Sequence, residues 1–262
     1  MSLAGKYPTI SHPLLTPELE ELRIEAIADL HIGVRAFEEK AFRAKLDAIR
    51  ESPNTLVVLD GDIINNSIKS SVGDVYEEIM TPDEQVDYAI DLLSPIKDRI
   101  IAVCRGNHEY RSIKDVCLDP VKYICRGLGI QGSYFRDAVF FELAFGRKAN
   151  KKRVTYSAYM SHGNGGGGTA GGKVNALSKA GFVAFSDVVI GAHTHMPATF
   201  KQPMLMQDPH NKNLVPVERI YVNTGTYLGM EDYAIRKNLP PSAIGNPTII
   251  LSGRKKKVRV LT

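Results

Sequence analysis

The hydrophobic and polar positions of the chain follow two alternating patterns. Short apolar runs such as TLVVLDGD (55–62) and RIIAVCRGNH (99–108) are typical of buried strands. Between them lie segments with apolar residues at helical spacing, of which Phe42, Leu46 and Ile49 mark the first. This alternation predicts an α/β fold in which helices cover sheets.

The segment 82–97 gives the clearest helix signal. Thr81 can cap it, Pro82 suits the first turn, and Glu84 completes a capping box. Its apolar stripe consists of Val86, Ala89, Ile90 and Leu93. A third helix is expected to begin at Asp119 and Pro120 and to end at Gly127.

Strand patterns dominate after residue 133. In VTYSAYMSHG (154–163) every second residue from Val154 to Met160 is apolar or aromatic, which predicts one buried face. The C-terminal GRKKKVRV (253–260) holds five basic residues and suggests nucleic-acid binding. Its Val258 and Val260 alternate with charges, however, and this favours a half-exposed edge strand.

No repeat or Ser/Pro-rich linker divides the 262 residues, so we expect a single domain spanning 1–262. Three stretches, 63–80, 163–173 and 228–246, are too long for simple connections and predict insertions. The segment 228–246 could fold over a site and supply Tyr233 or Arg236, or it could be an ordinary loop at a sheet edge.

The composition points to a soluble protein. The net charge of +4 permits a polyanionic partner without arguing for one. The three cysteines, Cys104, Cys117 and Cys125, lack metal-ligand spacing and suit a reducing compartment, so we expect a cytoplasmic location. We expect no membrane segment, because no apolar run approaches about 20 residues and the N-terminus lacks the hydrophobic region of a signal peptide. The sequence leaves the oligomeric state open.

Polar residues with ligand chemistry gather just past the expected strand ends. The carboxyl ends of strands in open α/β sheets form binding crevices, so these residues could meet although they are far apart in sequence. Residues two apart would share one face of an extended segment and could hold one ion. The residues are Asp29 and His31, Asp62 and Asn65, Asn107 and His108, His162, and His193 and His195.

Each of these motifs alone has an ordinary explanation. A single histidine near a strand end usually makes hydrogen bonds, which is how we interpret His12 and His210, and GD or GN pairs are common in turns. Recurrence at five places is not expected by chance, and it favours a metal site.

The glycine-rich stretch SHGNGGGGTAGGKV (161–174) also resembles a phosphate-binding loop, with Gly172 and Lys173 in place. Val174, however, lacks the hydroxyl that such a loop uses to bind Mg²⁺, and the lysine of such a loop should open a helix. We therefore favour a flexible loop at the rim of the site, from which Lys173 could reach a substrate phosphate, or a merely mobile loop. A nucleotide-hydrolysing switch remains the alternative and would depend on Lys173 and not on Asp62.

The ordered series DxH, GDxx(D/N), GNH(D/E), H and GxHxH, followed by YVNTGT (221–226), resembles the calcineurin-like metallophosphoesterase superfamily. The resemblance implies a four-layer sandwich: two packed β-sheets flanked by helices, with two metal ions at the sheet ends. It places His108 beside the substrate, outside the metal shell. The implied ligands are Asp29, His31, Asp62 and His195 for one ion, and Asp62, Asn107, His162 and His193 for the other.

The chain departs from the family pattern in places. Ala192 stands between the usual Gly and the first histidine of the last pair, Asn65 stands where Asp is common, and NTG (223–225) lacks a central Pro. RGNHE (105–109) is typical of Ser/Thr protein phosphatases, but Asn65, Asn66 and Ser67 replace their DRG tripeptide. This disfavours a protein phosphatase. Asn65, Arg105 and Lys173 are the candidates for contacting substrate.

The implied ligands are oxygen and imidazole nitrogen, which favours two divalent ions such as Mn, Fe, Zn or Ni, with Mn preferred. Two ions that share Asp62 would lower the pKa of a bridging water and produce hydroxide as the nucleophile. His108 could donate a proton to the leaving oxygen.

Because the phosphate-binding Arg of the protein phosphatases is missing, we expect phosphodiesters, including nucleotides or nucleic acid, to be the substrates. Hydrolysis of monoesters, and a non-catalytic binding module on the same fold, are the alternatives.

Overall fold

Two five-stranded β-sheets form the centre of the computed structural model, which describes residues 7–69, 71, 78–165, 167–208, 210–230 and 240–262. The first sheet has the order β10-β9-β1-β2-β3 and the second β4-β5-β6-β8-β7. The first comprises β1 (Glu21–Ile27), β2 (Thr55–Asp60), β3 (Ile100–Cys104), β9 (Thr248–Ser252) and β10 (Val258–Leu261). The second comprises β4 (Ala138–Phe145), β5 (Val154–Ser161), β6 (Val188–Gly191), β7 (Ala198–Asp208) and β8 (Asn213–Asn223).

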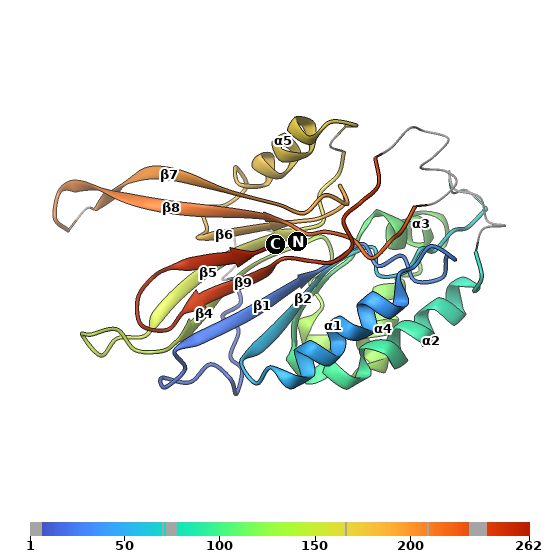
Figure 1. The fold of residues 1–262 in the computed structure, drawn as a ribbon, viewed down its shortest axis with the longest axis horizontal. Helices are drawn as coiled ribbons and strands as arrows, with labels where there is room; N and C mark the ends of the chain where they lie inside the picture. Colours follow the sequence, from blue (N-terminus) through green and yellow to red (C-terminus); the bar gives the residue numbers. More distant parts are fainter. Residues whose placement is uncertain (1–6, 70, 72–77, 166, 209, 231–239) are drawn as a thin grey trace.

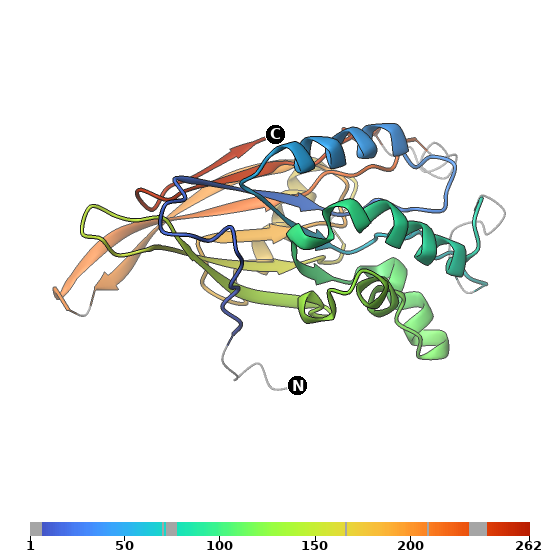
Figure 2. The ribbon, with the colours of Figure 1, turned by 90° about the horizontal axis from the view of Figure 1, so that it is seen from below.

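Helices cover the outer faces of both sheets (Figure 1). Figure 2 shows α1 and α2 side by side across the first sheet, and α5 lies over β6 and β8 of the second. The helices are α1 (Glu39–Glu51), α2 (Pro82–Leu93), α3 (Asn107–Val116), α4 (Pro120–Gly127) and α5 (Ala170–Ala180), with the short 3₁₀ helices η2 (Ser94–Arg99) and η3 (Gln131–Ser133). The expected four-layer α/β sandwich is confirmed.

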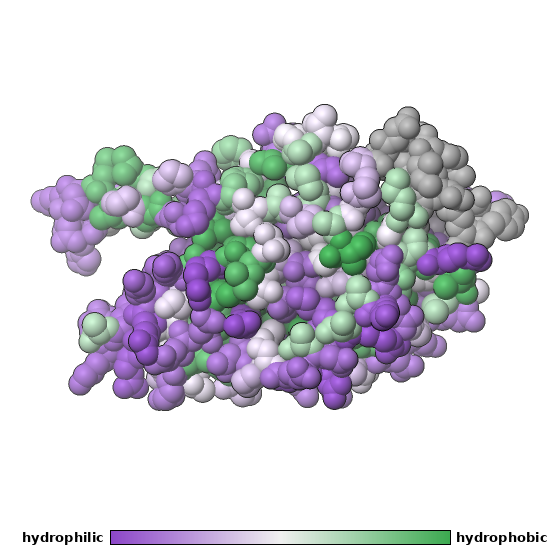
Figure 3. Space-filling view, viewed as in Figure 1, coloured by the Kyte–Doolittle hydropathy of each residue, from purple (hydrophilic) through white to green (hydrophobic). Residues whose placement is uncertain are grey.

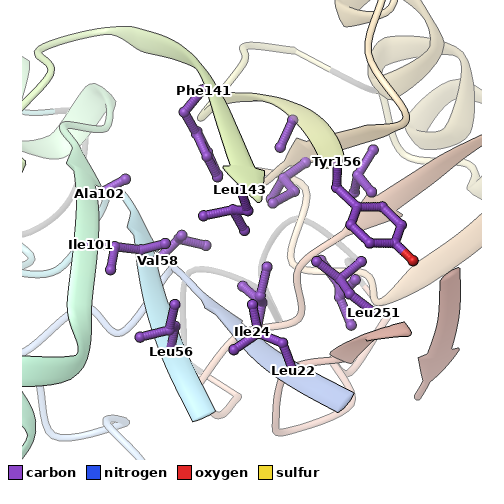
Figure 4. Packing of buried hydrophobic residues seen from close by; sticks show 14 of the residues in the cluster. Leu22, Ile24, Leu56, Val58, Ile101, Ala102, Phe141, Leu143, Tyr156 and Leu251 are labelled. Atoms are coloured by element: carbon purple, nitrogen blue, oxygen red, sulfur yellow. The ribbon is translucent and has the colours of Figure 1, made fainter. Parts of the chain in front are cut away.

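Apolar side chains from both sheets interlock in the space between them (Figure 4). Ile24 and Val58 of the first sheet belong to the same buried cluster as Phe141 and Tyr156 of the second. A second cluster lies between the first sheet and the helices and includes Phe42. Burial of apolar surface at about 25 cal/mol per Å² makes these two clusters the main source of stability.

Most of the expected elements are present. The Thr81 backbone N–H donates to the Glu84 carboxylate at 2.7 Å, as the capping box requires. The α-helix ends at Leu93, earlier than predicted, and the chain continues as η2. Pro95 explains this, because it has no N–H to donate to the preceding turn. At the C-terminus, β10 is an edge strand as predicted, with Val258 and Val260 packed against the core between the sheets.

The glycine-rich stretch differs from the prediction. Only its first part is a loop, because α5 begins at Ala170 and Thr169 caps it by accepting the Gly172 N–H at 3.2 Å. Lys173 thus lies in the first helical turn, and the expectation that no helix opens at this lysine was wrong. Val174 still offers no hydroxyl for Mg²⁺. Tyr233 and Arg236 lie outside the described residues.

Candidate metal centre

Five strands deliver the candidate ligands to one edge of the sandwich. Strands β1, β2 and β3 run parallel, as do β5 and β6, so the carboxyl ends of each group lie together. The connections that follow them carry the candidate residues, and both sheets contribute. In chain order these are Asp29 and His31 after β1, Asp62 after β2, Asn107 and His108 after β3, His162 after β5, and His193 and His195 after β6.

The paired ligands are not on extended segments, contrary to the geometry expected from their spacing. Asp29 and His31 both have φ of 52°, and His193 and His195 have 69° and 54°, all in the left-handed region. Asp62 has 49°. Non-glycine residues adopt such angles only where the surrounding structure enforces them, and they cluster at functional sites. The turns, rather than strand alternation, bring the side chains together.

One group of side chains surrounds Asp29. Its Oδ1 lies 3.3 Å from His195 Nε2 and 3.8 Å from His31 Nε2. The two imidazole Nε2 atoms are 3.1 Å apart. These three residues offer ligand atoms that all lie within 4.8 Å of one another, which is the spacing expected for atoms that bind one ion.

A second group surrounds Asp62. Its Oδ2 lies 3.2 Å from His162 Nε2, which is itself 3.2 Å from Asn107 Oδ1. His193 completes this group with Asp62 and His162, again within 4.8 Å. The same Asp62 oxygen is 4.0 Å from His31 Nε2, so Asp62 lies between the two groups.

Each carboxylate has one oxygen held by the backbone and one directed at the cluster. The His193 N–H donates to Asp29 Oδ2 at 3.0 Å, and the His108 N–H donates to Asp62 Oδ1 at 2.9 Å. Asp29 Oδ1 and His193 Nδ1 are buried without a hydrogen-bond partner among the described residues. Buried polar atoms are rarely left unsatisfied. These orphaned ligand atoms, together with an oxygen and nitrogen donor set, fit divalent cations.

Hydrogen bonds also fix the histidine rings. His31 Nδ1 lies 3.1 Å from Asn65 Oδ1, and His162 Nδ1 lies 2.5 Å from the Asp60 carbonyl oxygen. Both acceptors hold a proton on Nδ1, so Nε2 is the nitrogen that the neutral ring offers to an ion.

The charges of the cluster are strongly coupled. Burial and the neighbouring histidines lower the pKa of His31 well below its usual value, and burial lowers that of His193. Burial also opposes protonation of His162 and His195. The negative charge of Asp62 outweighs this effect at His162, and that of Asp29 outweighs it at His195, so the pKa values of both histidines are raised. Without ions, protonated histidines therefore balance the buried carboxylates, and a bound cation would replace those protons.

Glu109 is a supporting residue that the sequence analysis did not identify. Its buried carboxylate accepts N–H bonds from Asp62 at 3.0 Å, Ile63 at 2.7 Å, Ile64 at 3.2 Å and Gly106 at 2.8 Å. It thereby holds the turn that carries Asp62. The signal was present, since Glu109 stands three residues after Gly106 at the start of α3, the capping-box position.

His108 lies at the edge of the cluster, with Nε2 3.8 Å from Asp62 Oδ2. Its Nδ1 is 2.7 Å from the Asn65 carbonyl oxygen, and its Nε2 is 3.0 Å from a guanidinium nitrogen of Arg111. Burial lowers the pKa of His108. Arg111, which the sequence analysis did not identify, makes no ion pair with any described residue and brings positive charge beside the cluster.

The three predicted substrate contacts have other environments. The Asn65 side chain contacts His31, Ser67 and Glu78. Arg105 donates to Asp137 at 2.8 Å and is 9% exposed. Lys173 makes no side-chain hydrogen bond or ion pair with the described residues of the cluster and is partly buried in α5. Their roles toward substrate stay predictions.

Several solved structures are similar to this chain at low identity. Vps29 from Entamoeba histolytica, complexed with zinc, is 11% identical with a TM-score of 0.41, covering 92% of this chain and 97% of that one. A metallophosphoesterase from Sphaerobacter thermophilus is 13% identical with a TM-score of 0.40, covering 92% and 89%. NAD nucleotidase (NadN) from Haemophilus influenzae is 14% identical with a TM-score of 0.41, covering 92% and 49%. A comparison with curated protein sequences finds no match.

Two packed mixed sheets with buried Asp and His clusters at the strand ends define an α/β protein built to bind metal. The family model of the calcineurin-like phosphoesterases matches residues 22–197, most of the chain and all of the candidate ligands. The chain therefore belongs to the calcineurin-like phosphoesterases. Among the described residues, no helix has the length and apolar character needed to cross a membrane.

Proposed function

We propose that the protein hydrolyses phosphodiesters with two divalent metal ions, Mn²⁺ being the preferred one. The observation that carries this proposal is the position of Asp62, whose Oδ2 faces His162 at 3.2 Å and His31 at 4.0 Å. A carboxylate that lies between two ligand groups could be shared by two divalent ions, which would make a two-metal site.

The two ligand groups would hold the ions as the resemblance to the family implies: Asp29, His31 and His195 on one side, and Asn107, His162 and His193 on the other, with Asp62 shared. When bound, the ions supply an activated water as nucleophile and positive charge for the phosphate oxygens. The chain itself provides a rigid frame, because the Asp62 and Asp29 carboxylates are each fixed by a backbone N–H. Preorganised groups of this kind need no rearrangement during the reaction.

His108 is placed to assist departure of the leaving oxygen. The Asn65 carbonyl oxygen keeps the proton on Nδ1, and Nε2 points to the Asp62 side of the cluster. A neutral ring with its proton on Nδ1 has none on Nε2, so the step requires His108 as imidazolium; in that form Nε2 can donate its proton to the leaving oxygen and return to neutral imidazole, a contribution typically of about 10² to 10⁴ in rate.

Arg111 favours a second candidate, hydrolysis of monoesters. A monoester phosphate carries more negative charge than a diester, and a guanidinium is well suited to bind it. Arg111 lies 3.0 Å from His108 and forms no close ion pair with a described residue, so it could replace the arginine that the DRG tripeptide would supply.

Hydrolysis of bis(p-nitrophenyl) phosphate and p-nitrophenyl phosphate, measured side by side with added Mn²⁺, tests both candidates. We expect faster cleavage of the diester by the wild type and none by Asp62→Asn. Preference for the monoester, lost in Arg111→Ala, would replace the diester assignment. Metal binding without hydrolysis of either compound would favour a binding module.

A further inference from the structure

Two basic turns lie next to each other at the end of the sandwich opposite the metal centre. The β4–β5 turn reads GRKANKKR (146–153), and the β9–β10 turn with the start of β10 reads GRKKKVR (253–259). Together they carry ten of the 33 Lys and Arg residues and no Asp or Glu. Because the net charge of the whole chain is only +4, the rest of the molecule is net acidic.

Glycines allow the two turns to meet. The Arg147 N–H donates to the Gly253 carbonyl oxygen at 2.8 Å. Gly146 has φ of +62°, and a Cβ added there would lie 2.2 Å from the Gly253 oxygen. A Cβ added to Gly253 would lie 1.9 Å from the Leu19 carbonyl oxygen. A larger residue at Gly146 would push the two turns apart, and one at Gly253 would push the β9–β10 turn away from the segment that precedes β1, so the contact between the turns depends on Gly146.

A buried tyrosine orders the β9–β10 turn. Tyr156 is 1% exposed. Its hydroxyl donates to the Ser252 carbonyl oxygen at 2.7 Å and accepts the Lys257 N–H at 3.0 Å. Tyr156 belongs to β5, the strand that follows the β4–β5 turn. The lysines of the β9–β10 turn thus project from a fixed backbone.

Most of the ten charges are not neutralised. Arg254 pairs with Glu20 at 2.5 Å, Lys256 with Asp187 at 2.8 Å, and Arg259 with Glu21 at 2.7 Å. The other seven make no ion pair with any described residue: Arg147, Lys148, Lys151, Lys152, Arg153, Lys255 and Lys257. Hydrophilic side chains cover this end of the molecule, below the β7–β8 hairpin (Figure 3).

We propose that these two turns form a nucleic-acid-binding surface that contacts backbone phosphates without reading the bases. A group of unpaired Lys and Arg side chains on a fixed backbone is the electrostatic footprint of such binding. The surface is separate from the metal centre, because β5 places the turn at its amino end and His162 just past its carboxyl end. Eight residues at about 3.3 Å each put them roughly 26 Å apart.

The composition of the turns favours nucleic acid over a lipid surface. The largest apolar side chain in 146–153 is Ala149, and 253–257 has none. Membrane-surface segments usually insert Trp, Phe or Leu among their basic residues. Val258 and Val260, which follow, pack against the core.

The test is fluorescence anisotropy with a labelled 30-residue oligothymidylate in EDTA, which prevents cleavage, at 50 to 200 mM KCl. Five phosphate contacts would give a slope of about −3.5 for log affinity against log salt, hence about 100-fold weaker binding over this range. Replacement of four exposed lysines of the turns, Lys151, Lys152, Lys255 and Lys257, by Gln should weaken binding at 50 mM KCl at least about 10-fold and reduce the slope by about 3.

A variant with the same charge change elsewhere is the control. Lys40, Lys114, Lys122 and Lys179 are exposed on α1, α3, α4 and α5, and their replacement by Gln should change affinity less than about 3-fold. Equal affinity of both quadruple variants would overturn the proposal. So would binding to phosphatidylserine vesicles without binding to the oligonucleotide. Hydrolysis of bis(p-nitrophenyl) phosphate should be unchanged in both variants, so this proposal and the proposed function can fail separately.

Discussion

Asp60, the last residue of β2, should make the metal-free protein less stable as the pH rises. Both of its carboxyl oxygens are buried without a hydrogen-bond partner among the described residues. Burial raises its pKa to about 8, with further increase from the negative charges of Asp29 and Asp62 and opposition from His162. Because the folded-state pKa exceeds the unfolded value of 3.8, folding favours the protonated form. The associated stability is complete below pH 3.8 and disappears as the pH rises toward 8.

Replacement of Asp60 by Asn keeps the shape and removes the ionisation. Each pH unit within the window corresponds to about 1.4 kcal/mol, so between pH 5 and pH 8 the wild type should lose roughly 3 to 4 kcal/mol relative to Asp60→Asn. Urea unfolding followed by circular dichroism, in EDTA at several pH values, measures this difference.

The control is Asp47→Asn, on the exposed face of α1, which should retain the pH dependence of the wild type. Parallel stability curves for the wild type and Asp60→Asn from pH 5 to pH 8 would refute the reasoning.

Three further predictions concern the cluster. Glu109→Ala leaves four backbone N–H groups without their acceptor and should destabilise the protein by at least about 3 kcal/mol in urea unfolding, whereas Glu84→Ala, at the exposed capping box of α2, should have a much smaller effect. His108→Ala should lower the rate on bis(p-nitrophenyl) phosphate by about 10² to 10⁴ and retain both ions; loss of an ion, seen by elemental analysis, would place His108 among the ligands. Adding Mn²⁺ to the metal-free protein at pH 6.5 should release protons, because neighbouring carboxylates raise the pKa values of His162 and His195. Calorimetry in two buffers of different ionisation enthalpy detects this release, and identical heats in both buffers would contradict it.

The layers of the fold could be predicted from the sequence because apolar periodicity reports burial directly. The stripe of α2 and the alternation in β5 were sufficient to place those elements. The end of α2 was less certain, because Pro95 can continue the chain as a 3₁₀ helix instead of ending all helical structure. The start of α5 was missed since its first turn contains two glycines, which have poor helix propensity, and Thr169 supplies the cap that the pattern did not weigh.

The meeting of Asp and His residues at the strand ends was also predictable, because parallel strands deliver their carboxyl ends to one edge. The detailed geometry was not. Left-handed φ angles at Asp29 and His193 have no local sequence signal in residues other than glycine, and they depend on the surrounding turns. The contact of Arg111 with His108 requires knowledge of the path of α3, whose first turn was read only as a motif.

Elemental analysis of the wild type and Asp62→Asn, after reconstitution with Mn²⁺ and dialysis, gives the number of ions bound per chain and thus tests whether two ions share Asp62. We predict two ions in the wild type, and fewer in Asp62→Asn together with loss of phosphodiester hydrolysis. Two ions and full activity in Asp62→Asn would contradict this prediction, because the shared carboxylate would then have no part in holding the metals.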